Sequence, residues 1–484
     1  MNLDVLKNML PQDAVSTSDS DLQAYKINDP LATGYMLPSA ILKPKNFEEL
    51  QKIIQTANKE DLKLVIVSSV APHNREGIGC TEEHVVVDLS GWKLIDGVDR
   101  KNLVCRVEPG VTYDELIPII DKEGMIFPMP LAPKSGKSIV AAILDREATN
   151  WPNHHWNSQD PLCSMEFAFG SGEQFRTGSA ANNVPVEQLR ALGISMKGPN
   201  GPGSLGLQRI IQGSQGCMGV VTWATIKLEM KPTISKVMIL QSDNLRQIEQ
   251  FVYDVDHHRW GERQYIFDNH TLAMLMTYKN PGDFDKVKAS FKKYICVQEI
   301  AGFHLFPEER LEYQTRDIKK IATGVGLKME EEVGGIAGSD ILAAATTPCG
   351  QTDWRKSLKG ECMSLHMQTT LDRANEYIGI FNAAASVAGI KREEYGVHIQ
   401  PIVQNSSVYI EFMLPYAAAD LEKIRAFEES ATKALNANQA FFARPYGTSA
   451  KIVWDNDPVS TKLMKQMKGL MDPNRVLCPG KFGL

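Results

Sequence analysis

One segment constrains this chain more than any other, a glycine-rich turn that leads directly into a strand. Residues 213–222 read GSQGCMGVVT, and the β-branched and apolar run continues to Leu228. Glycine lacks a Cβ atom, so Gly213 and Gly216 let a ligand approach the backbone of the turn closely. The run that follows has the composition of a buried strand. The segment therefore predicts a core strand whose leading turn is open to a bound ligand.

The length and composition of the chain exclude several classes of protein. Its 484 residues suffice for two or three domains with sizeable cores. A net charge of −6 and a pI near 6.0 argue against a nucleic-acid surface. No apolar run is long enough to cross a bilayer, and the first residues do not resemble a signal peptide. The eight cysteines form no CxxC pair, so we expect reduced thiols, a cytoplasmic protein and no iron–sulfur site.

Helical and strand patterns alternate along the first half of the chain. Asn46 precedes an amphipathic run and Glu49 stands at the capping-box position, which predicts a helix start. Strands are expected at 63–67, 85–89 and 103–107, and a further helix at 113–123. After Pro232 a second set of helices and strands begins. The pattern predicts an α+β fold with more than one module.

Four segments, taken together and in order, resemble one family of flavoproteins. They are the entry at residues 42–67, VEPGVTYDEL at 107–116, the turn at 213–222, and the tail at 472–481. This set is similar to the FAD-linked oxidases of the vanillyl-alcohol oxidase and p-cresol methylhydroxylase (PCMH) type. The resemblance spans nearly the whole chain. It implies FAD as cofactor and an α+β fold in which a two-part FAD-binding domain carries an inserted α/β cap domain.

The resemblance also implies where the domains begin and end. Residues 1–232 are expected to form the FAD-binding PCMH-type domain, and residues 446–484 to complete it. Residues 233–445 are expected to form a cap domain over the isoalloxazine ring. This division agrees with physical needs, because a pyrophosphate requires converging backbone N–H groups. A flavin in turn requires a closed pocket under a separate wall that shapes the substrate.

The expected cofactor contacts follow from the same resemblance. The first flavin loop reads SSVAPHNREG at residues 68–77, with less glycine than the family usually carries there. His73 is a candidate for a covalent tether to the flavin, and a loop-bracing or solvent-facing histidine is the alternative. The residues expected to contact the cofactor are Ser68, Ser69, His73, Asn74, Pro109, Gly110, Val111, Asp145, Ser214, Gly216, Gly219, Val220, Val221 and Lys481.

A histidine in the second half of the chain is a candidate catalytic base. Residues 395–400 read YGVHIQ, and strand alternation places Tyr395, Val397 and Ile399 on one face with His398 on the other. Histidine titrates near working pH, so His398 is suited to take a proton from the substrate. A structural histidine with satisfied hydrogen bonds is the alternative.

We expect an arginine side chain to balance the negative charge that develops on the substrate. Tyr446 matches a tyrosine that phenol-oxidising relatives carry and is a second candidate base, but Gly447 stands where those relatives have an arginine. Arg444 lies close by in the sequence and is expected to substitute. Arg176 follows the hairpin Gly170–Gly172 and is the other candidate. An arginine beside the flavin would stabilise a phenolate or a carboxylate.

Three further motifs have structural explanations. GPGSLG at residues 201–206 matches GxGxxG, but no apolar strand precedes it, so we expect a loop and no Rossmann site. His154 and His155 lie near Asp160, yet adjacent strand residues point to opposite faces, and we expect no metal site. Residues 363–370 are expected to form a cap strand that packs in the core or lines the substrate pocket.

The residues together predict an FAD-dependent dehydrogenase or oxidase. His398 or Tyr446 would deprotonate a p-substituted phenol or aromatic alcohol, and a hydride would pass to flavin N5. A 2-hydroxy acid such as glycolate or lactate is the alternative substrate, and a second arginine in the pocket would favour it. A third hypothesis is a flavin-poor subunit that works with an iron–sulfur or cytochrome partner. Homo-oligomerisation is compatible with each.

Overall fold

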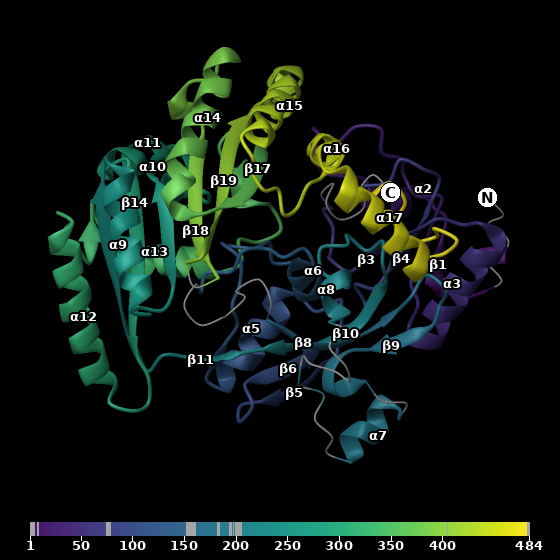
Figure 1. Cartoon of the computed structure of the whole chain (residues 1–484). Coiled ribbons are helices and arrows are strands. Elements are labelled where there is room, and N and C mark those ends of the chain that lie inside the picture. The colour runs from purple at the N-terminus through teal and green to yellow at the C-terminus, as the bar shows by residue number, and fades with distance from the viewer. Residues whose placement is uncertain are drawn as a thin grey trace.

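The computed structural model shows two lobes side by side, with the last helices lying on the first lobe (Figure 1). It describes residues 5–6, 9–73, 79–151, 161–181, 184–192, 196, 198, 206–403 and 405–481. Asn74, the adjacent pair of histidines and most of the 201–206 motif lie outside the described residues. Among the helices that are described, none has both the length and the apolar character to span a bilayer.

The first lobe begins with a four-stranded sheet in the order β1-β2-β4-β3. Strands β2, β4 and β3 are parallel, and β1 is antiparallel to β2. The predicted helix α3 connects β2 to β3, and the Asn46 side chain caps it by accepting from Glu49 N at 2.9 Å. Its apolar face is buried against this sheet. The bounds are β1 (Val15–Ser16), α2 (Asp19–Ala24), β2 (Ala40–Leu42), α3 (Phe47–Glu60), β3 (Leu64–Val67) and β4 (Val85–Asp88).

A second, antiparallel sheet of the first lobe has the order β5-β6-β10-β8-β9. The strand predicted after the glycine-rich turn is β10, at the centre of this sheet and buried except at its last residue. The bounds are β5 (Ile95–Asp99), β6 (Val104–Val107), α5 (Tyr113–Lys122), β7 (Met125–Ile126), α6 (Ile139–Leu144), β8 (Leu162–Ala168), β9 (Gln174–Arg176), α7 (Val186–Ala191), α8 (Gln208–Ile211), β10 (Val220–Lys227) and β11 (Glu229–Met230).

The second lobe, the cap, is built on a six-stranded antiparallel sheet in the order β12-β14-β13-β18-β19-β17. The strand bounds are β12 (Ile234–Ser242), β13 (Gln264–Asp268), β14 (Tyr294–Gly302), β15 (Glu332–Val333), β16 (Ile336–Ala337), β17 (Glu361–Thr369), β18 (Gly396–Ile402) and β19 (Ser407–Tyr416). The helix bounds are α9 (Leu245–His257), α10 (Asn269–Thr277), α11 (Phe284–Ser290), α12 (Pro307–Gly324), α13 (Gly338–Thr346), α14 (Ala374–Val387) and α15 (Leu421–Ala437).

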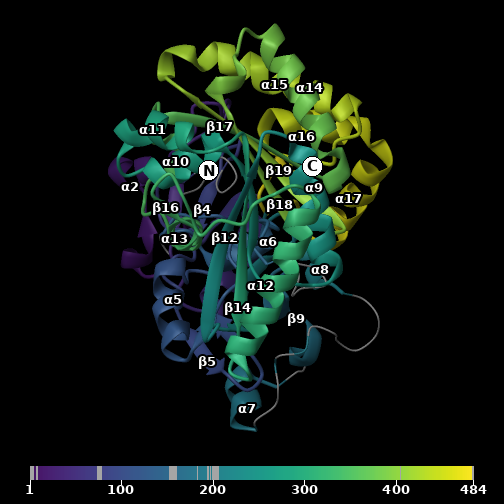
Figure 2. The same cartoon turned by 90° about the vertical axis from the view of Figure 1, so that its left-hand side faces the viewer.

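Helices cover the two faces of the cap sheet unequally. Helices α9, α12, α14 and α15 bury apolar side chains against the outer face of the sheet, and Figure 2 shows α12 beside β14. On the other face, α10 and α13 cover mainly the half formed by β12, β14 and β13. The half formed by β18, β19 and β17 turns polar side chains toward the first lobe. A site between the lobes is therefore a consequence of how the helices pack.

A short seam of backbone hydrogen bonds joins the lobes. Residues 132–135 of the first lobe lie against residues 345–350 of the cap, at the end of α13 and just after it. The bonds are Ala132 N to Ala345 O (2.9 Å), Cys349 N to Pro133 O (2.9 Å) and Ser135 N to Gly350 O (3.0 Å). Nearby, the Asn150 side chain donates to the Tyr265 hydroxyl at 2.6 Å. The seam fixes the cap beside the loop that precedes α6.

After the cap, α16 (Gly447–Asn456) and α17 (Pro458–Met471) bring the chain back to the first lobe. The tail lies beside β3, where Leu64 N donates to Val476 O and Cys478 N to Leu64 O, both at 2.7 Å. The buried Lys468 ammonium of α17 donates to Cys217 O at 2.7 Å, which ties the helix to the glycine-rich turn. These contacts support the expected three-part division, whose limits at residues 232 and 445 stay a prediction.

Candidate active site

A cavity of about 250 Å³ lies between the first lobe and the polar half of the cap sheet. This volume is just below the roughly 300–1,000 Å³ of most small-molecule sites. The first lobe contributes Ser69, His73, Lys137, Asp145 and Glu147, and the cap contributes Arg355, Ser364, His366, His398, Tyr409, Glu411 and Arg444. The cavity thus combines predicted residues from both lobes with others that the sequence did not single out.

Strand alternation explains which cap residues reach the cavity. On β18, Val397 and Ile399 join the apolar core beneath α14 and α15, whereas His398 lines the cavity. The predicted facing of residues 395–400 is confirmed. On β17, Met363, Leu365 and Met367 likewise pack in the core, and Ser364 and His366 line the cavity. The expected core packing is confirmed for one face, and a substrate pocket on the other face stays a prediction.

His398 is buried without a hydrogen-bond partner. Its side chain is 3% exposed, and neither ring nitrogen has a partner among the residues that the structure describes. The ring stacks on Phe267 of β13, with centroids 5.1 Å apart. Burial lowers the pKa of His398 to about 4, so the imidazole is neutral at neutral pH. The imidazole therefore has a lone pair free for a proton, but its lowered pKa makes it a weak base until a ligand or a neighbouring charge raises that pKa.

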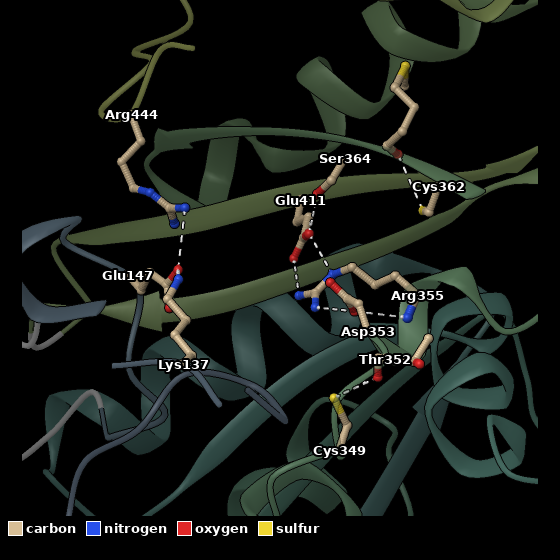
Figure 3. A network of polar contacts seen from close by, with 11 residues as sticks. Lys137, Glu147, Cys349, Thr352, Asp353, Arg355, Cys362, Ser364, Glu411 and Arg444 are labelled. Atoms are coloured by element: carbon tan, nitrogen blue, oxygen red, sulfur yellow. Dashed lines mark hydrogen bonds and ion pairs between the residues drawn. The ribbon is translucent and has the colours of Figure 1, made fainter. Parts of the chain in front are cut away.

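A charged cluster from the first lobe and the 444–446 segment forms one end of the cavity. Glu147 is paired with Lys137 and also lies 3.6 Å from the Arg444 guanidinium (Figure 3). The Tyr446 hydroxyl donates to Asp145 Oδ1 at 2.8 Å. Burial raises the pKa of Asp145, whereas Lys137 and Arg444 outweigh burial at Glu147 and lower its pKa. Arg444 Nε is buried and has no hydrogen-bond partner within the described part of the chain.

A second ion pair lies on the cap sheet. Arg355 donates to both carboxylate oxygens of Glu411, Nε to Oε1 at 2.9 Å and Nη2 to Oε2 at 3.0 Å. The Ser364 hydroxyl donates to the same carboxylate, and Figure 3 shows both donors converging on it. Burial opposes ionisation of Glu411, but Arg355 and Ser364 prevail and lower its pKa to about 2. Arg355 is the second arginine of the cavity, and Glu411 occupies its fork.

Three loops of the first lobe are joined by hydrogen bonds around Ser69, which lines the cavity. Ser138 N donates to Ser69 Oγ at 3.0 Å, and Ser138 Oγ donates to Pro109 O at 2.5 Å. Val111 O accepts from Ile139 N at 3.0 Å. These bonds bring together loops that lie up to 69 residues apart in the sequence. Ser138 was not among the predicted residues, although its place as N-cap of α6 is a signal that sequence can supply.

The glycine-rich turn packs beside these loops and has the backbone conformation that glycine favours. Gly213 and Gly216 have φ of 74° and 80°, in the left-handed region. Gly213 N donates to Leu144 O at 2.6 Å, next to Asp145 in the cavity lining. The Gln215 side chain donates to Pro445 O at 3.0 Å. The turn thus lies between α6 and the segment that carries Arg444 and Tyr446.

Several predicted cofactor residues have packing roles. A Cβ on Gly110 would lie 2.4 Å from Ser90 O, so tight packing alone requires that glycine. A Cβ on Gly219 would lie 3.0 Å from Phe167. The Ser214 hydroxyl donates to Ile211 O at 2.7 Å. Val220 and Val221 are buried in β10, and Ser68 is half-buried after β3. Lys481 is buried, with its ammonium 6.0 Å from the centroid of the Tyr446 ring.

Two of the predicted residues have contrasting positions. His73 lines the cavity, stacks on Tyr25 with centroids 5.2 Å apart, and is 6% exposed, so it is not solvent-facing. Burial lowers the pKa of His73 to about 4. Arg176 lies on β9 and is not part of the cavity lining. Its Nε donates to Glu166 Oε2 at 2.7 Å and its Nη1 to Val184 O at 2.6 Å, so the structure does not bring Arg176 to Arg444.

Comparisons with known proteins agree with this architecture. The FAD binding domain family matches residues 38–178. The GlcD subunit of glycolate oxidase from Bacillus subtilis is 24% identical over 288 residues, 59% of this chain and 54% of its own. The mitochondrial D-lactate dehydrogenase [cytochrome] of Arabidopsis thaliana is 25% identical over 206 residues, 42% of this chain and 32% of its own. The chain thus spans about half or less of these relatives.

Among solved structures, p-cresol methylhydroxylase with substrate bound has the same fold. It superposes with a TM-score of 0.83 at 16% identity, covering 100% of this chain and 96% of that one. Residues 38–178 thus match an FAD binding domain, and the chain has the fold of p-cresol methylhydroxylase. The domain match indicates FAD as the cofactor.

The described residues fit FAD. Gly213 and Gly216 of the turn carry no Cβ atoms, and the loops of Pro109 and Ser138 are joined by hydrogen bonds to that of Ser69, which lines the cavity. We infer that these segments hold the cofactor, with His73 facing it. No group of three or more described His, Cys, Asp or Glu side chains is placed to hold a metal ion.

Proposed function

We propose that this protein is an FAD-dependent oxidoreductase that oxidises a p-substituted phenol or aromatic alcohol. The observation that carries the proposal is the pairing, in one cavity, of a buried imidazole with a buried arginine N–H, neither of which has a hydrogen-bond partner among the described residues. A substrate hydroxyl needs both, a base for its proton and a donor for the oxygen that becomes negative. Bound FAD supplies the acceptor for the hydride.

The charges of the cavity favour a substrate that is neutral before it reacts. Glu411 takes both arms of the Arg355 fork, and Glu147 is shared by Lys137 and Arg444. A carboxylate substrate needs a bidentate arginine, and Glu411 already occupies the fork of Arg355. A phenol or alcohol needs only one donor, which Arg444 Nε provides.

Each residue then has a distinct role. His398 accepts the hydroxyl proton, and Arg444 donates to the substrate oxygen. The Tyr446 hydroxyl donates a hydrogen bond to Asp145, which supports a positioning role for Tyr446 near Arg444 rather than the role of base. Lys137 and Glu147 hold Arg444 in place through the shared ion pairs. His73 remains the candidate for a covalent link to the cofactor.

The 2-hydroxy acid alternative has support of its own. The Bacillus and Arabidopsis relatives are by name a glycolate oxidase subunit and a D-lactate dehydrogenase. Arg355 does place a second arginine in the cavity, the feature expected to favour an acid. A substrate carboxylate would have to displace Glu411 from Arg355. A partner that accepts electrons, a homo-oligomer, a flavin-poor role and a cytoplasmic location remain further proposals.

The first experiment is an absorption spectrum of the purified protein before and after acid precipitation. Flavin bands confirm the cofactor, and colour retained in the pellet assigns a covalent link that His73→Ala should abolish. A colourless protein that takes up no FAD supports the flavin-poor subunit. Turnover is then measured with a dye acceptor on p-cresol and 4-hydroxybenzyl alcohol, and on glycolate and D-lactate. Oxidation of the acids alone overturns the phenol proposal.

The base is tested by His398→Asn. We expect kcat on the preferred phenol to fall roughly 10²-fold or more, because general base catalysis contributes that much. Flavin absorbance should be unchanged, since His398 lies on the cap sheet and not in the loops of the first lobe. His84 is a matched control, a buried histidine of the first lobe whose pKa burial also lowers. Full turnover of His398→Asn contradicts the assignment.

A further inference from the structure

Four side chains form a row across four adjacent strands of the cap sheet. In register, Phe267 of β13 pairs with His398 of β18, His398 with Glu411 of β19, and Glu411 with His366 of β17. Directly opposed residues in an antiparallel sheet have Cβ atoms roughly 4.5–5.5 Å apart. His366, Glu411 and His398 all line the cavity. The row therefore places a carboxylate beside the imidazole assigned above as base.

The two histidines of the row differ in their surroundings. His366 is engaged, because its Nε2 lies 3.2 Å from Arg444 O and its ring stacks on Tyr409. His398 has no hydrogen-bond partner within the described residues, so its response to charge is governed by its neighbours through space. These are Glu411 from β19, Arg355 from the turn before β17, and Asp268 from β13, which is paired with Arg392 at 2.7 Å.

We propose that Glu411 is a positioning residue for His398, and that Arg355 and Ser364 set how strongly it acts. When His398 accepts the substrate proton, a buried imidazolium forms next to the Glu411 carboxylate. The carboxylate stabilises that cation, while Arg355, bonded to both of its oxygens, offsets much of the attraction. Glu411 thus favours proton transfer, and Arg355 adds to the effect of burial, which already keeps the resting imidazole neutral. This inference rests on the proposed function only for the source of the proton.

The geometry supports a tuned arrangement rather than a simple structural ion pair. Glu411 is held by three donor atoms, Nε and Nη2 of Arg355 and Oγ of Ser364, so its carboxylate has little freedom to rotate. Arg355 is itself fixed, with Nη1 3.4 Å from Asp353 Oδ1 and its guanidinium 4.6 Å above the Trp354 ring. Because the Arg355–Glu411 pair is fixed, its charges act on the His398 imidazole from constant positions.

The test reads the protonation of His398 directly and needs no substrate. The full-length holoprotein is labelled with 13Cε1-histidine, which gives a resolvable set because the chain has ten histidines. The signal of His398 is the one that His398→Asn removes. It is titrated from pH 8 to pH 5 in wild type, E411Q, R355Q and the double variant R355Q/E411Q. The signal of His84, on the first lobe, serves as internal control.

Opposite shifts are expected. R355Q leaves the Glu411 charge uncompensated, so the His398 midpoint should rise by about one pH unit or more, into the titrated range. R355Q/E411Q should return it to the wild-type position. E411Q should abolish the onset of protonation that wild type shows near pH 5, and this comparison does not depend on R355Q folding. A His398 titration that is the same in all four proteins, or that moves equally in R355Q and R355Q/E411Q, overturns the proposal.

Activity separates this inference from the proposed function. If the titrations shift as expected but His398→Asn oxidises the phenol at the full rate, the coupling stands and the assignment of the base fails. If the base is correct and the coupling acts in catalysis, E411Q should lower kcat about tenfold without changing KM, and E411D should recover most of the loss. Equal kcat for E411Q and wild type contradicts a role in proton transfer.

Discussion

Replacing one buried lysine should loosen the first lobe at the glycine-rich turn. Lys468 is 4% exposed, and its ammonium donates to Cys217 O at 2.7 Å, to Leu477 O at 2.8 Å and to Asp472 Oδ2 at 2.5 Å or less. It therefore connects α17, the tail and the turn through a single group. Lys468→Met keeps most of the side-chain volume but leaves the fully buried Asp472 carboxylate without its cation.

The magnitude follows from what Asp472 retains. Removing one partner of a buried ion pair costs roughly 3–5 kcal/mol. Asp472 still accepts from Val476 N at 3.0 Å and from Leu477 N at 2.8 Å, so we expect the low end of this range, about 3 kcal/mol. At about 2 °C per kcal/mol for a lobe of this size, the melting temperature should fall by about 6 °C.

The assay follows the release of FAD during a thermal melt, because flavin fluorescence reports on the first lobe. Lys465→Met is the matched control, since Lys465 lies on the same helix and is exposed. Its melting temperature should stay within about 1 °C of wild type. If the melting temperature of Lys468→Met equals that of Lys465→Met, the hydrogen bonds of Lys468 do not stabilise the turn, and the reasoning is refuted.

Three further perturbations test the site and the cap. Burial lowers the pKa of His73, His270 and His398 to about 4, below the ordinary 6.5. Because unfolding then takes up protons, the free energy of unfolding should fall as the pH drops from 6.5 toward 4. Equal urea midpoints at pH 7.5 and pH 5 would contradict this. Arg444→Gln should lower kcat/KM for the phenol roughly 10²-fold with flavin absorbance intact, and an unchanged value removes Arg444 from the site. Phe381→Ala removes a ring stacked 4.0 Å from Phe412 and should cost about 3–5 kcal/mol, seen as a lower urea midpoint of the cap.

The elements that sequence predicts well are those fixed by local patterns. The capped helix α3, the strand β10 and the alternation around His398 each depend on residues within one turn or one strand. Which residues of a cap strand face the core follows from the alternation of side chains along the strand alone. These features needed no knowledge of the partner elements, which is why they are found as expected.

The charge network of the cavity depends on contacts that no local pattern encodes. Arg355 meets Glu411 across 56 residues, and Tyr446 meets Asp145 across 301. The position of Arg355 is set by the packing of Trp354 in the cap core, so sequence does not reveal that it reaches the cavity. Arg176 was expected at the site but forms an ion pair with Glu166 on the neighbouring strand, so both charges are paired within the sheet.

The seam at residues 132–135 has a consequence for how a substrate reaches the cavity. A hinged opening of the two lobes would break three backbone hydrogen bonds at once, each worth about 1 kcal/mol, besides the contact of Asn150 with Tyr265. Because these bonds precede the loop of Ser138, such an opening would also pull on the segment inferred to hold the cofactor. The seam therefore disfavours a hinged opening by about 3 kcal/mol, and a covalent link introduced across the lobes should leave turnover intact if substrate reaches the cavity without such an opening.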